Sequence, residues 1–399
     1  MRLSQRVQQL KPSPTLAMAA KAKQLRAQGK DVISLSVGEP NWDTFPSIKE
    51  AGKKAIDEGK TKYTPAAGIP ELREVICQQT KRFLSLEYQP SQVTVSSGGK
   101  FILFSAMQSL LDPGDEVLIP APYWVSYPTM VELAGACPQK IPCSSTSGFK
   151  LTAEQLQQAI SDKTRLLLLN SPSNPTGKMY SKEELEALAQ VLLKHPHLFI
   201  ISDDIYNRLV FSCEVAPHLL QVCPELQSRT LIVNGVSKTY SMTGWRVGWA
   251  LGPEEWISAM TRYQSQSVSS ACTPSQWAAL WALEHAESEL KQAREELKSI
   301  KTFVCQLFTD LPSIQVIEPD GAFYLWTDIS AYLGASYKGQ TVTDSRHLCR
   351  LLLEEQLIAA VPGIEFGMEG FVRLSFALKR ERMEEAHRRL QSFFKSFSS

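Results

Sequence analysis

A lysine among small residues is the first feature of this sequence that could do chemistry. Lys238 follows the apolar run 231–233, which is typical of a buried strand. A lysine in a tight, sheltered turn can lose its proton and attack a carbonyl group. A solvated surface charge is the ordinary alternative. The small residues that crowd the lysine on both sides are Gly235, Ser237, Ser241 and Gly244.

A second chemical group, Arg246, follows a few positions later. Its planar guanidinium can make two charge-assisted hydrogen bonds to a phosphate at once. A lysine for an aldehyde and an arginine for a phosphate are what an enzyme needs to hold pyridoxal 5′-phosphate as a Schiff base. The pair therefore predicts this cofactor, provided that other segments supply its remaining contacts.

Acidic and aromatic residues stand at the end of another predicted strand. Asp203 and Asp204 follow the apolar run 198–202, and Tyr206 comes shortly after. The carboxyl ends of strands form the ligand edge of an α/β sheet. One carboxylate there can keep a pyridine nitrogen protonated. A helix cap followed by a packing tyrosine would explain the same residues without a ligand.

Two more strand ends could contact a flat anionic ligand. Within 93–111 a predicted strand runs into Gly99 and Lys100, where a helix begins, and the first amides of a helix form an anion site. Trp124 follows the strand 116–120 in a loop, where its ring can stack on a heteroaromatic ring. A solvated first-turn lysine and a buried core tryptophan are the plain alternatives.

Four further residues suit a bound amino acid or cofactor. Asn174 lies between two prolines, which restrict its conformation, and Gly38 in a Gly-Glu-Pro turn could let a ligand approach the backbone. Tyr63 stands in a loop where surface exposure is equally consistent. Arg373 interrupts the apolar strand 371–377. A charge there is costly to bury unless paired, and a bidentate arginine suits an α-carboxylate.

Composition limits the classes of function. With 399 residues the chain should form roughly two domains. Lys and Arg total 42 against 41 Asp and Glu, so no global field attracts nucleic acid or an anionic membrane. No apolar run approaches the roughly 20 residues of a spanning helix, and the N-terminus lacks a secretory apolar core, so we expect a cytoplasmic protein. The eight cysteines and six histidines lack metal-binding spacing, so we expect buried free thiols and no metal.

The order of predicted elements indicates an α/β fold. Strands alternate with helices from about 93 to 250, which predicts a mostly parallel sheet covered on both faces. Segment 283–308 is predicted to be one long charged helix that leaves this domain. A smaller α+β domain should follow, with short strands near 314–318, 323–327 and 371–376.

Eight motifs, in order, resemble those of the class I, fold-type I aminotransferases, and most closely the gamma-type aspartate aminotransferases. They are SVGEP, KYTPAAG, PAPYWVSYP, SPSNPTG, SDDIY, NGVSK with MTGWRVGW, PDGAFY and VRLSFA. The resemblance spans essentially the whole chain. It implies a large cofactor-binding domain over 48–295 with a mostly parallel seven-stranded sheet. A small α+β domain would comprise 296–399 and part of 1–47, the N-terminal arm. It also implies a homodimer with shared active sites.

The resemblance assigns roles around the cofactor ring. Lys238 would be the Schiff-base lysine and proton carrier, and Asp203 would pair with the ring nitrogen. Tyr206 and Asn174 would contact the phenolic oxygen O3′, and Trp124 would stack on the ring. The phosphate would be held by Arg246, by the amides of Gly99 and Lys100, and by Tyr63 of the partner subunit.

The same resemblance assigns a substrate site beside Trp124 and Asn174. Arg373 and the backbone of Gly38 would take the α-carboxylate, and Lys100 would receive the distal carboxylate of aspartate or glutamate. Thr15 together with Lys100 resembles the subset that accepts prephenate. The implied activity is a ping-pong transamination between L-aspartate or L-glutamate and 2-oxoglutarate or oxaloacetate, with amination of prephenate to arogenate as a second activity.

Three positions depart from the family's pattern. Gly235 stands where some relatives place a phosphate-binding serine, so Ser237 or another hydroxyl would substitute. Asp204 replaces the usual glutamate, and segment 363–370 differs before the carboxylate arginine. These departures bear on substrate range. A β-lyase or an aromatic-preferring transaminase remains an alternative, as does a cofactor-binding regulator without catalytic activity.

Overall fold

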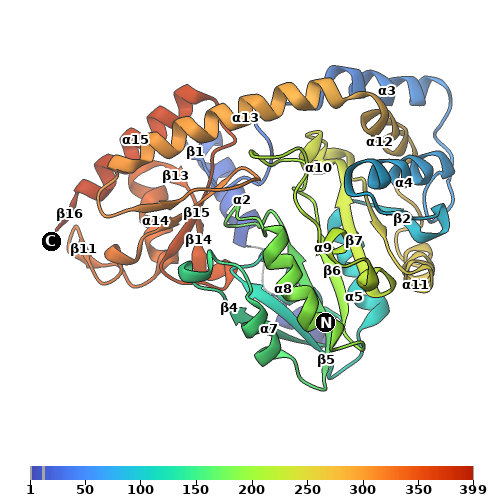
Figure 1. The fold of residues 1–399 in the computed structure, drawn as a ribbon. Helices are drawn as coiled ribbons and strands as arrows, with labels where there is room; N and C mark the ends of the chain where they lie inside the picture. Colours follow the sequence, from blue (N-terminus) through green and yellow to red (C-terminus); the bar gives the residue numbers. More distant parts are fainter. Residues whose placement is uncertain (1, 11–13, 399) are drawn as a thin grey trace.

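The structure, a computed structural model, describes residues 2–10 and 14–398. A seven-stranded sheet with strand order β2-β8-β7-β6-β5-β3-β4 forms the centre of the larger part (Figure 1). Only β8 runs antiparallel to its neighbours, so the predicted mostly parallel seven-stranded sheet is confirmed. The strands are β2 (Val93–Ser96), β3 (Glu116–Ala121), β4 (Cys137–Pro142), β5 (Thr164–Asn170), β6 (Phe199–Asp203), β7 (Thr230–Gly235) and β8 (Gly248–Leu251).

The inner strands are apolar because helices bury both faces of the sheet. In β5, Leu166 and Leu168 belong to one core cluster, which includes Met107 of α5, whereas Leu167 lies in a second cluster with Leu188 of α8. A strand buried on both faces has an uninterrupted apolar run, as this one has. The helices of this part are α3 (Pro46–Asp57), α4 (Pro70–Leu84), α5 (Gly99–Leu110), α6 (Tyr127–Leu133), α7 (Ala153–Ala159), α8 (Lys182–Leu193), α9 (Leu219–Val222), α10 (Val236–Thr239) and α11 (Glu254–Ser265).

The single long helix predicted over 283–308 is wrong in one respect. The structure has two helices, α12 (Thr273–His285) and α13 (Glu287–Leu307), which meet at Ala286. Ala286 is fully buried, and its ψ of 17° departs from helical geometry, so packing bends the chain where the sequence alone reads as continuous helix. Helix α13 then crosses from the large sheet towards the C-terminal part (Figure 1).

The C-terminal part is built on a four-stranded antiparallel sheet with order β14-β15-β10-β9. A short N-terminal strand also belongs here, because β1 (Ile33–Ser34) pairs with β13 (Ile358–Ala359). The domain boundaries at 47/48 and 295/296 stay a prediction. The remaining elements are β9 (Gln315–Ile317), β10 (Tyr324–Asp328), β11 (Ser336–Tyr337), β12 (Gln340–Thr341), α14 (Ser345–Gln356), β14 (Val361–Pro362), β15 (Phe371–Ser375), α15 (Arg380–Lys395) and β16 (Phe397–Ser398).

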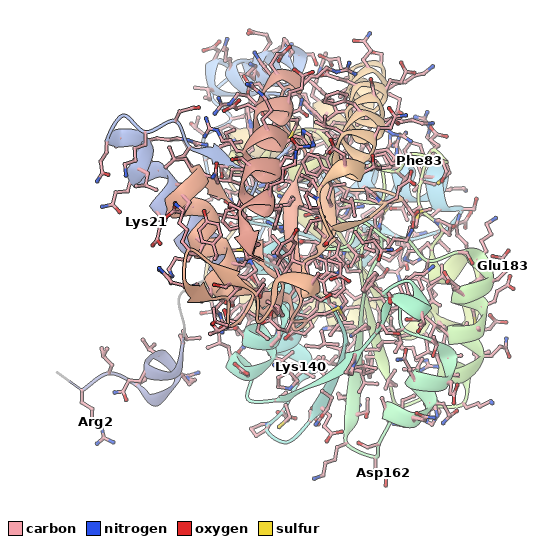
Figure 2. All side chains as sticks on the ribbon, turned by 90° about the vertical axis from the view of Figure 1, so that its left-hand side faces the viewer. Arg2, Lys21, Phe83, Lys140, Asp162 and Glu183 are labelled. Carbon is pink, nitrogen blue, oxygen red and sulfur yellow. The ribbon has the colours of Figure 1, made fainter. Side chains whose placement is uncertain are left out.

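The N-terminal segment stands apart from the body of the molecule. Helix α1 (Gln5–Gln9) extends beyond α2 (Pro14–Ala27), as the position of the labelled Arg2 shows (Figure 2). No helix in the described residues is long and apolar enough to cross a membrane. The described residues also contain no group of three or more side chains that could hold a metal ion.

All eight cysteines are free thiols, but they are not all buried. The expectation of buried thiols is wrong for Cys137, Cys213 and Cys272, which are exposed. A cysteine is small enough to stand at a surface position with little energetic consequence, so its spacing in the sequence does not report its burial.

Candidate active site

A cavity of about 600 Å³ lies where the large sheet meets the C-terminal part. The last residues of β5 and β6, the turn after β7, and Arg373 and Tyr324 of the C-terminal sheet all line it. Every predicted site residue except Tyr63 and Thr15 contributes to its wall. Carboxyl ends of parallel strands meet at one sheet edge, which explains how segments far apart in sequence converge.

Lys238 lies in α10, directly after β7. Its Nζ donates to the backbone oxygen of Gly38 at 2.5 Å, so the amine reaches across the cavity to the predicted substrate loop. Burial lowers the pKa of Lys238 to about 8, although the charge of Glu39 opposes this shift. A neutral, nucleophilic amine is therefore accessible near neutral pH.

Asp203 ends β6 and is almost fully buried. Burial raises the pKa of its carboxyl group to about 6, and the hydrogen bond from Tyr127 Oη to Oδ2, at 2.6 Å, opposes the rise. A cation placed beside this poorly solvated carboxylate would be strongly held. Tyr127, at the start of α6, is a residue that the sequence analysis missed. Its position three residues after Trp124 in a strand-end loop was the available signal.

Asp204 lies outside the cavity, which resolves the choice between the two neighbouring carboxylates. Its Oδ1 accepts from Ser202 Oγ at 2.6 Å, and its Oδ2 lies 3.4 Å from His218 Nε2. Burial raises the pKa of Asp204 to about 8 and lowers the pKa of His218 to about 4. This closed pair is therefore mostly uncharged at neutral pH, whereas Asp203 faces the cavity.

Asn174 is held between two elements. Its backbone N–H donates to Asn170 Oδ1 at 2.9 Å, and its own Oδ1 accepts from Arg373 Nη1 at 2.8 Å. Because the amide oxygen is occupied, the NH₂ group is the end left for a ligand in the cavity. Asn170, which also donates to the backbone of Asp203 at 2.8 Å, was missed by the sequence analysis. It is the last residue of β5, a position that could have suggested it.

Arg373 is a buried cation without an anionic partner. It is only 2% exposed, and Nη2 donates to the backbone oxygen of Ser36 at 2.8 Å. Its Nε has no hydrogen-bond partner within the described residues, and none of the described carboxylates forms an ion pair with it. Burial lowers its pKa, yet a guanidinium stays charged in proteins. A carboxylate entering the cavity would supply the missing charge.

The N-terminus of α5 and Arg246 form a compact anion site. Gly98 caps the helix with φ +87°, and a Cβ there would lie 2.6 Å from Arg246 Nη2. The amides of Gly99 and Lys100 begin the helix and have no intrahelical acceptor. Burial, reinforced by the Arg246 charge, lowers the pKa of Lys100, whose Nζ lies 5.0 Å from the centroid of the Trp124 ring.

The unusual glycine before the lysine has a steric cause. A Cβ on Gly235 would lie 2.9 Å from the backbone oxygen of Val247, so a serine could enter only if the backbone moved. Ser237 lines the cavity instead. The atypical segment 363–370 lies beside the loop that contains Trp124, because Tyr123 N in this loop donates to Phe366 O at 3.0 Å.

Two predicted residues lie elsewhere. Tyr63 is 94% exposed and does not reach this chain's own cavity. Thr15 belongs to α2, and its side chain is outside the part of the chain that the structure describes.

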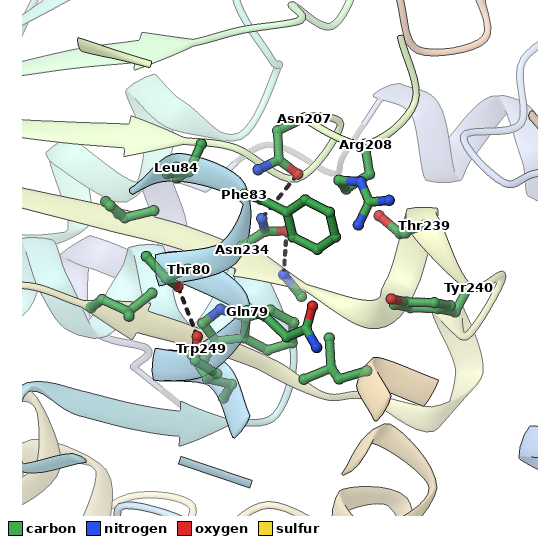
Figure 3. A pocket seen from close by; sticks show the side chains of 15 residues that line it. Gln79, Thr80, Phe83, Leu84, Asn207, Arg208, Asn234, Thr239, Tyr240 and Trp249 are labelled. Atoms are coloured by element: carbon green, nitrogen blue, oxygen red, sulfur yellow. Dashed lines mark hydrogen bonds between the residues drawn. The ribbon is translucent and has the colours of Figure 1, made fainter. Parts of the chain in front are cut away.

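A second, much smaller cavity of about 60 Å³ lies behind the lysine turn, between β7, β8 and α4 (Figure 3). Asn234 Nδ2 donates to Asn207 Oδ1 at 3.1 Å, and Arg208 forms an ion pair with Glu287 at 2.6 Å. Figure 3 shows the two amides turned towards each other. The hydrogen bond between the two asparagines joins the segment after Tyr206 to the end of β7, directly before the turn that carries Lys238.

The residues of the large cavity fit pyridoxal 5′-phosphate. The α5 N-terminus with Arg246 suits the phosphate. Asp203 is buried and forms no ion pair within the described residues, so a protonated ring nitrogen would suit it. The depressed pKa of Lys238 suits a reaction with the aldehyde.

Comparison with known proteins supports this fit. The family described as "Aminotransferase class I and II" matches residues 30–390. The chain therefore belongs to the class I and II aminotransferases and is a pyridoxal phosphate-dependent transferase.

Particular relatives narrow the comparison. The chain is 47% identical over 392 residues to an aspartate/prephenate aminotransferase of Cereibacter sphaeroides, covering 98% of both chains. It is 41% identical over 393 residues to an aspartate aminotransferase of Bacillus sp. (strain YM-2), covering 98% of this chain and 99% of the relative. The crystal structure of the Rhizobium meliloti aspartate aminotransferase matches with a TM-score of 0.96 at 40% identity and full coverage of both chains. The Thermus thermophilus enzyme with maleate matches with a TM-score of 0.92 at 41% identity, covering 98% of this chain and 100% of the other.

Proposed function

We propose that this protein is an aspartate aminotransferase that moves an amino group between L-aspartate or L-glutamate and 2-oxoglutarate or oxaloacetate. The main support is Arg373, which is buried in the same cavity as Lys238 and Asp203 and has no anionic partner among the described residues. A second cation, Lys100, lines that cavity and suits a second carboxylate. The maleate bound by the Thermus enzyme is likewise a dicarboxylate.

Each residue of the ring site then has a task. Pyridoxal phosphate, when bound, supplies an electron-withdrawing ring that acidifies the substrate Cα–H bond. Lys238 Nζ would take the proton from the substrate Cα and deliver it to C4′ of the cofactor, because burial makes the neutral amine accessible. Asp203 keeps the ring nitrogen protonated, and Tyr206 and Asn174 donate to the phenolic oxygen. Trp124 stacks on the ring.

The charged ends of the site hold the anionic groups. Arg246 and the amides of Gly99 and Lys100 bind the phosphate. Arg373 binds the substrate α-carboxylate next to the backbone of Gly38. Because Arg373 is already held by Asn174 and Ser36, it is oriented before the substrate arrives, which lowers the cost of binding.

We further propose a homodimer in which Tyr63 of the partner subunit completes each phosphate site. Support comes from the exposure of Tyr63, whose side chain has no contact with its own cavity. A cytoplasmic location and the domain boundaries given above remain predictions of the same kind.

Amination of prephenate is a second candidate activity. The relatives from Cereibacter sphaeroides and Nitrosomonas europaea are both named aspartate/prephenate aminotransferases. Prephenate carries two carboxylates, so Arg373 and Lys100 could pair with both, and Thr15 together with Lys100 resembles the subset of the family that accepts prephenate. Activity with prephenate as acceptor and glutamate as donor would support it.

A half-reaction screen tests the proposed function. The holoenzyme is mixed with aspartate, glutamate, phenylalanine, alanine or a cysteine conjugate, and conversion of the cofactor's absorbance is followed. Aspartate and glutamate should convert it at much lower concentrations than the others. A preference for phenylalanine, or elimination from the cysteine conjugate, would favour the rival activities, and no conversion at all would favour a non-catalytic regulator.

Lys100→Ala sharpens the screen. It should lower kcat/KM about 10- to 100-fold for aspartate and glutamate, because one charge-assisted contact is lost, and less than about threefold for alanine. Lys140→Ala, an exposed lysine of β4 outside the cavity, is the matched control. An equal loss for all substrates would contradict the role of Lys100.

A further inference from the structure

We propose that Tyr324 is a positioning residue of the transamination, acting through Tyr206. Its hydroxyl donates to Tyr206, so that the Tyr206 proton is directed into the cavity. The inference rests on the proposed function, because it concerns the donor that faces the cofactor's phenolic oxygen.

Tyr324 brings the C-terminal sheet into contact with the cofactor site. It begins β10, is 0% exposed, and its Oη lies 2.8 Å from Tyr206 Oη. A Cβ on Gly38 would lie 3.1 Å from the same hydroxyl, so the Tyr324 oxygen packs against the loop whose carbonyl accepts from Lys238. The Tyr324 hydroxyl thus contacts Tyr206, which faces the cofactor site, and packs against the Gly38 loop that accepts a hydrogen bond from Lys238.

The hydrogen count determines which phenol must donate. Each tyrosine hydroxyl has a single hydrogen, and either oxygen of this pair could be the donor. If Tyr206 uses its hydrogen for an oxygen in the cavity, only Tyr324 can supply the hydrogen between the two rings. A donor behind Tyr206 also polarises the Tyr206 O–H bond and makes it a stronger donor.

The charged groups around the pair favour this orientation. The guanidinium carbon of Arg373, from β15, lies 4.3 Å from the centroid of the Tyr324 ring. A cation in this position makes a phenol a better hydrogen-bond donor, and it acts on Tyr324 more directly than on Tyr206. The other charges near the pair are Asp203, at the end of β6, and Glu39, in the loop after β1.

Tyr324→Phe removes only the hydroxyl and keeps the ring beneath Arg373. A donor at the phenolic oxygen stabilises the form in which that oxygen carries full negative charge. Weakening the donor should therefore raise the pH midpoint of the bound cofactor's absorbance change, by about 0.5 to 1 unit. We also expect kcat to fall about 3- to 10-fold with little change in KM for aspartate.

A double-mutant cycle tests whether Tyr324 acts through Tyr206. Tyr206→Phe should shift the pH midpoint further than Tyr324→Phe does, and adding Tyr324→Phe to it should shift the midpoint no more. Tyr180→Phe is the matched control, because Tyr180 Oη is buried outside the large cavity and accepts from Leu151 N at 2.9 Å. It should lower stability without moving the midpoint.

Two outcomes would overturn the inference. One is a folded Tyr324→Phe enzyme with the wild-type midpoint, and the other is an undiminished Tyr324→Phe shift in the Tyr206→Phe background. Both require a wild-type protein that binds the cofactor and transaminates aspartate. If the wild type did neither, the proposed function itself would fail instead.

Discussion

Two cavities are lined by residues of the turn after β7, and they differ in whether their buried polar side chains have hydrogen-bond partners. The large one contains Arg373, whose Nε has no partner in the described residues. The small one contains Arg208 as well, but this arginine is paired with Glu287. Within the part of the chain that the structure describes, no buried polar side-chain atom of the small cavity is without a hydrogen-bond partner.

The difference separates a binding site from a structural contact. A buried polar group costs free energy unless it is paired, so an unpaired buried cation that lines a cavity favours the binding of an anion there. In the large cavity, the unpaired Arg373 Nε is a group that a substrate carboxylate would complete. Substitutions in the two cavities should therefore affect different quantities.

The largest difference in turnover is expected between two substitutions in the turn after β7, which lines both cavities. Lys238→Ala should lower turnover at least about 1000-fold, because both the nucleophile and the proton carrier are lost. Thr239→Ala, the next residue and part of the small cavity, should keep activity within about threefold. Steady-state assays and the absorbance of the bound cofactor measure both. Residual transamination by Lys238→Ala near the wild-type rate would remove the basis of the assignment.

A conservative change at each arginine should sharpen the contrast. Arg373→Lys should lower kcat/KM for aspartate about 30- to 1000-fold, mainly through KM, because lysine cannot reproduce the planar fork that also contacts Asn174 and Ser36. Arg208→Lys should leave kcat/KM within about threefold. Similar losses in both variants would mean that the small cavity also takes part in binding.

The small cavity should instead govern stability. Arg208→Met breaks the ion pair with Glu287 and leaves that partly exposed carboxylate unpaired. We expect a loss of about 1 to 3 kcal/mol in the free energy of unfolding, with unchanged activity per folded molecule. Urea titration with activity measured on the same samples provides the test. A fall in kcat at unchanged stability would contradict the comparison.

The smallest effect on activity is expected at Asp204, which directly follows β6 and does not line the large cavity. Its folded pKa of about 8 exceeds its ordinary value of 3.8. The unfolded chain therefore releases this proton as pH rises above about 4, while the folded protein keeps it until about pH 8, so wild-type stability falls over this window. Asp204→Asn should be more stable than the wild type at pH 7, and this difference in the free energy of unfolding should shrink to zero near pH 4. A difference independent of pH would show that Asp204 is already ionised.

Much of the large domain could be predicted because its signals are local. Apolar runs that end in Asp203 or Gly235 mark buried strands and the ligand edge of the sheet. The capping box of Ser181 and Glu184 at the start of α8 is likewise visible within four residues. The bend at Ala286 was missed because packing, rather than residue type, interrupts the helix.

Within the site, the roles of Tyr127, Asn170 and Tyr324 could not be predicted from the sequence. Tyr127 and Tyr324 lie within the motifs PAPYWVSYP and PDGAFY, but the role of each residue depends on another functional residue that it contacts. Tyr127 donates to Asp203 across 76 positions, and Tyr324 meets Tyr206 across 118. Their types are common in cores and strand ends, so only the partner reveals the role.

The sequence by itself determined which chemical groups are present and that they stand at strand ends, because burial patterns and turns are properties of short segments. The tertiary structure alone decided that Arg373 meets Asn174 across 199 positions and Ser36 across 337, and that none of the described carboxylates pairs with it. Those contacts arise where β15 meets the loops that follow β5 and β1. No local pattern of residues encodes which side chains meet there, or which of them is left without its counter-charge.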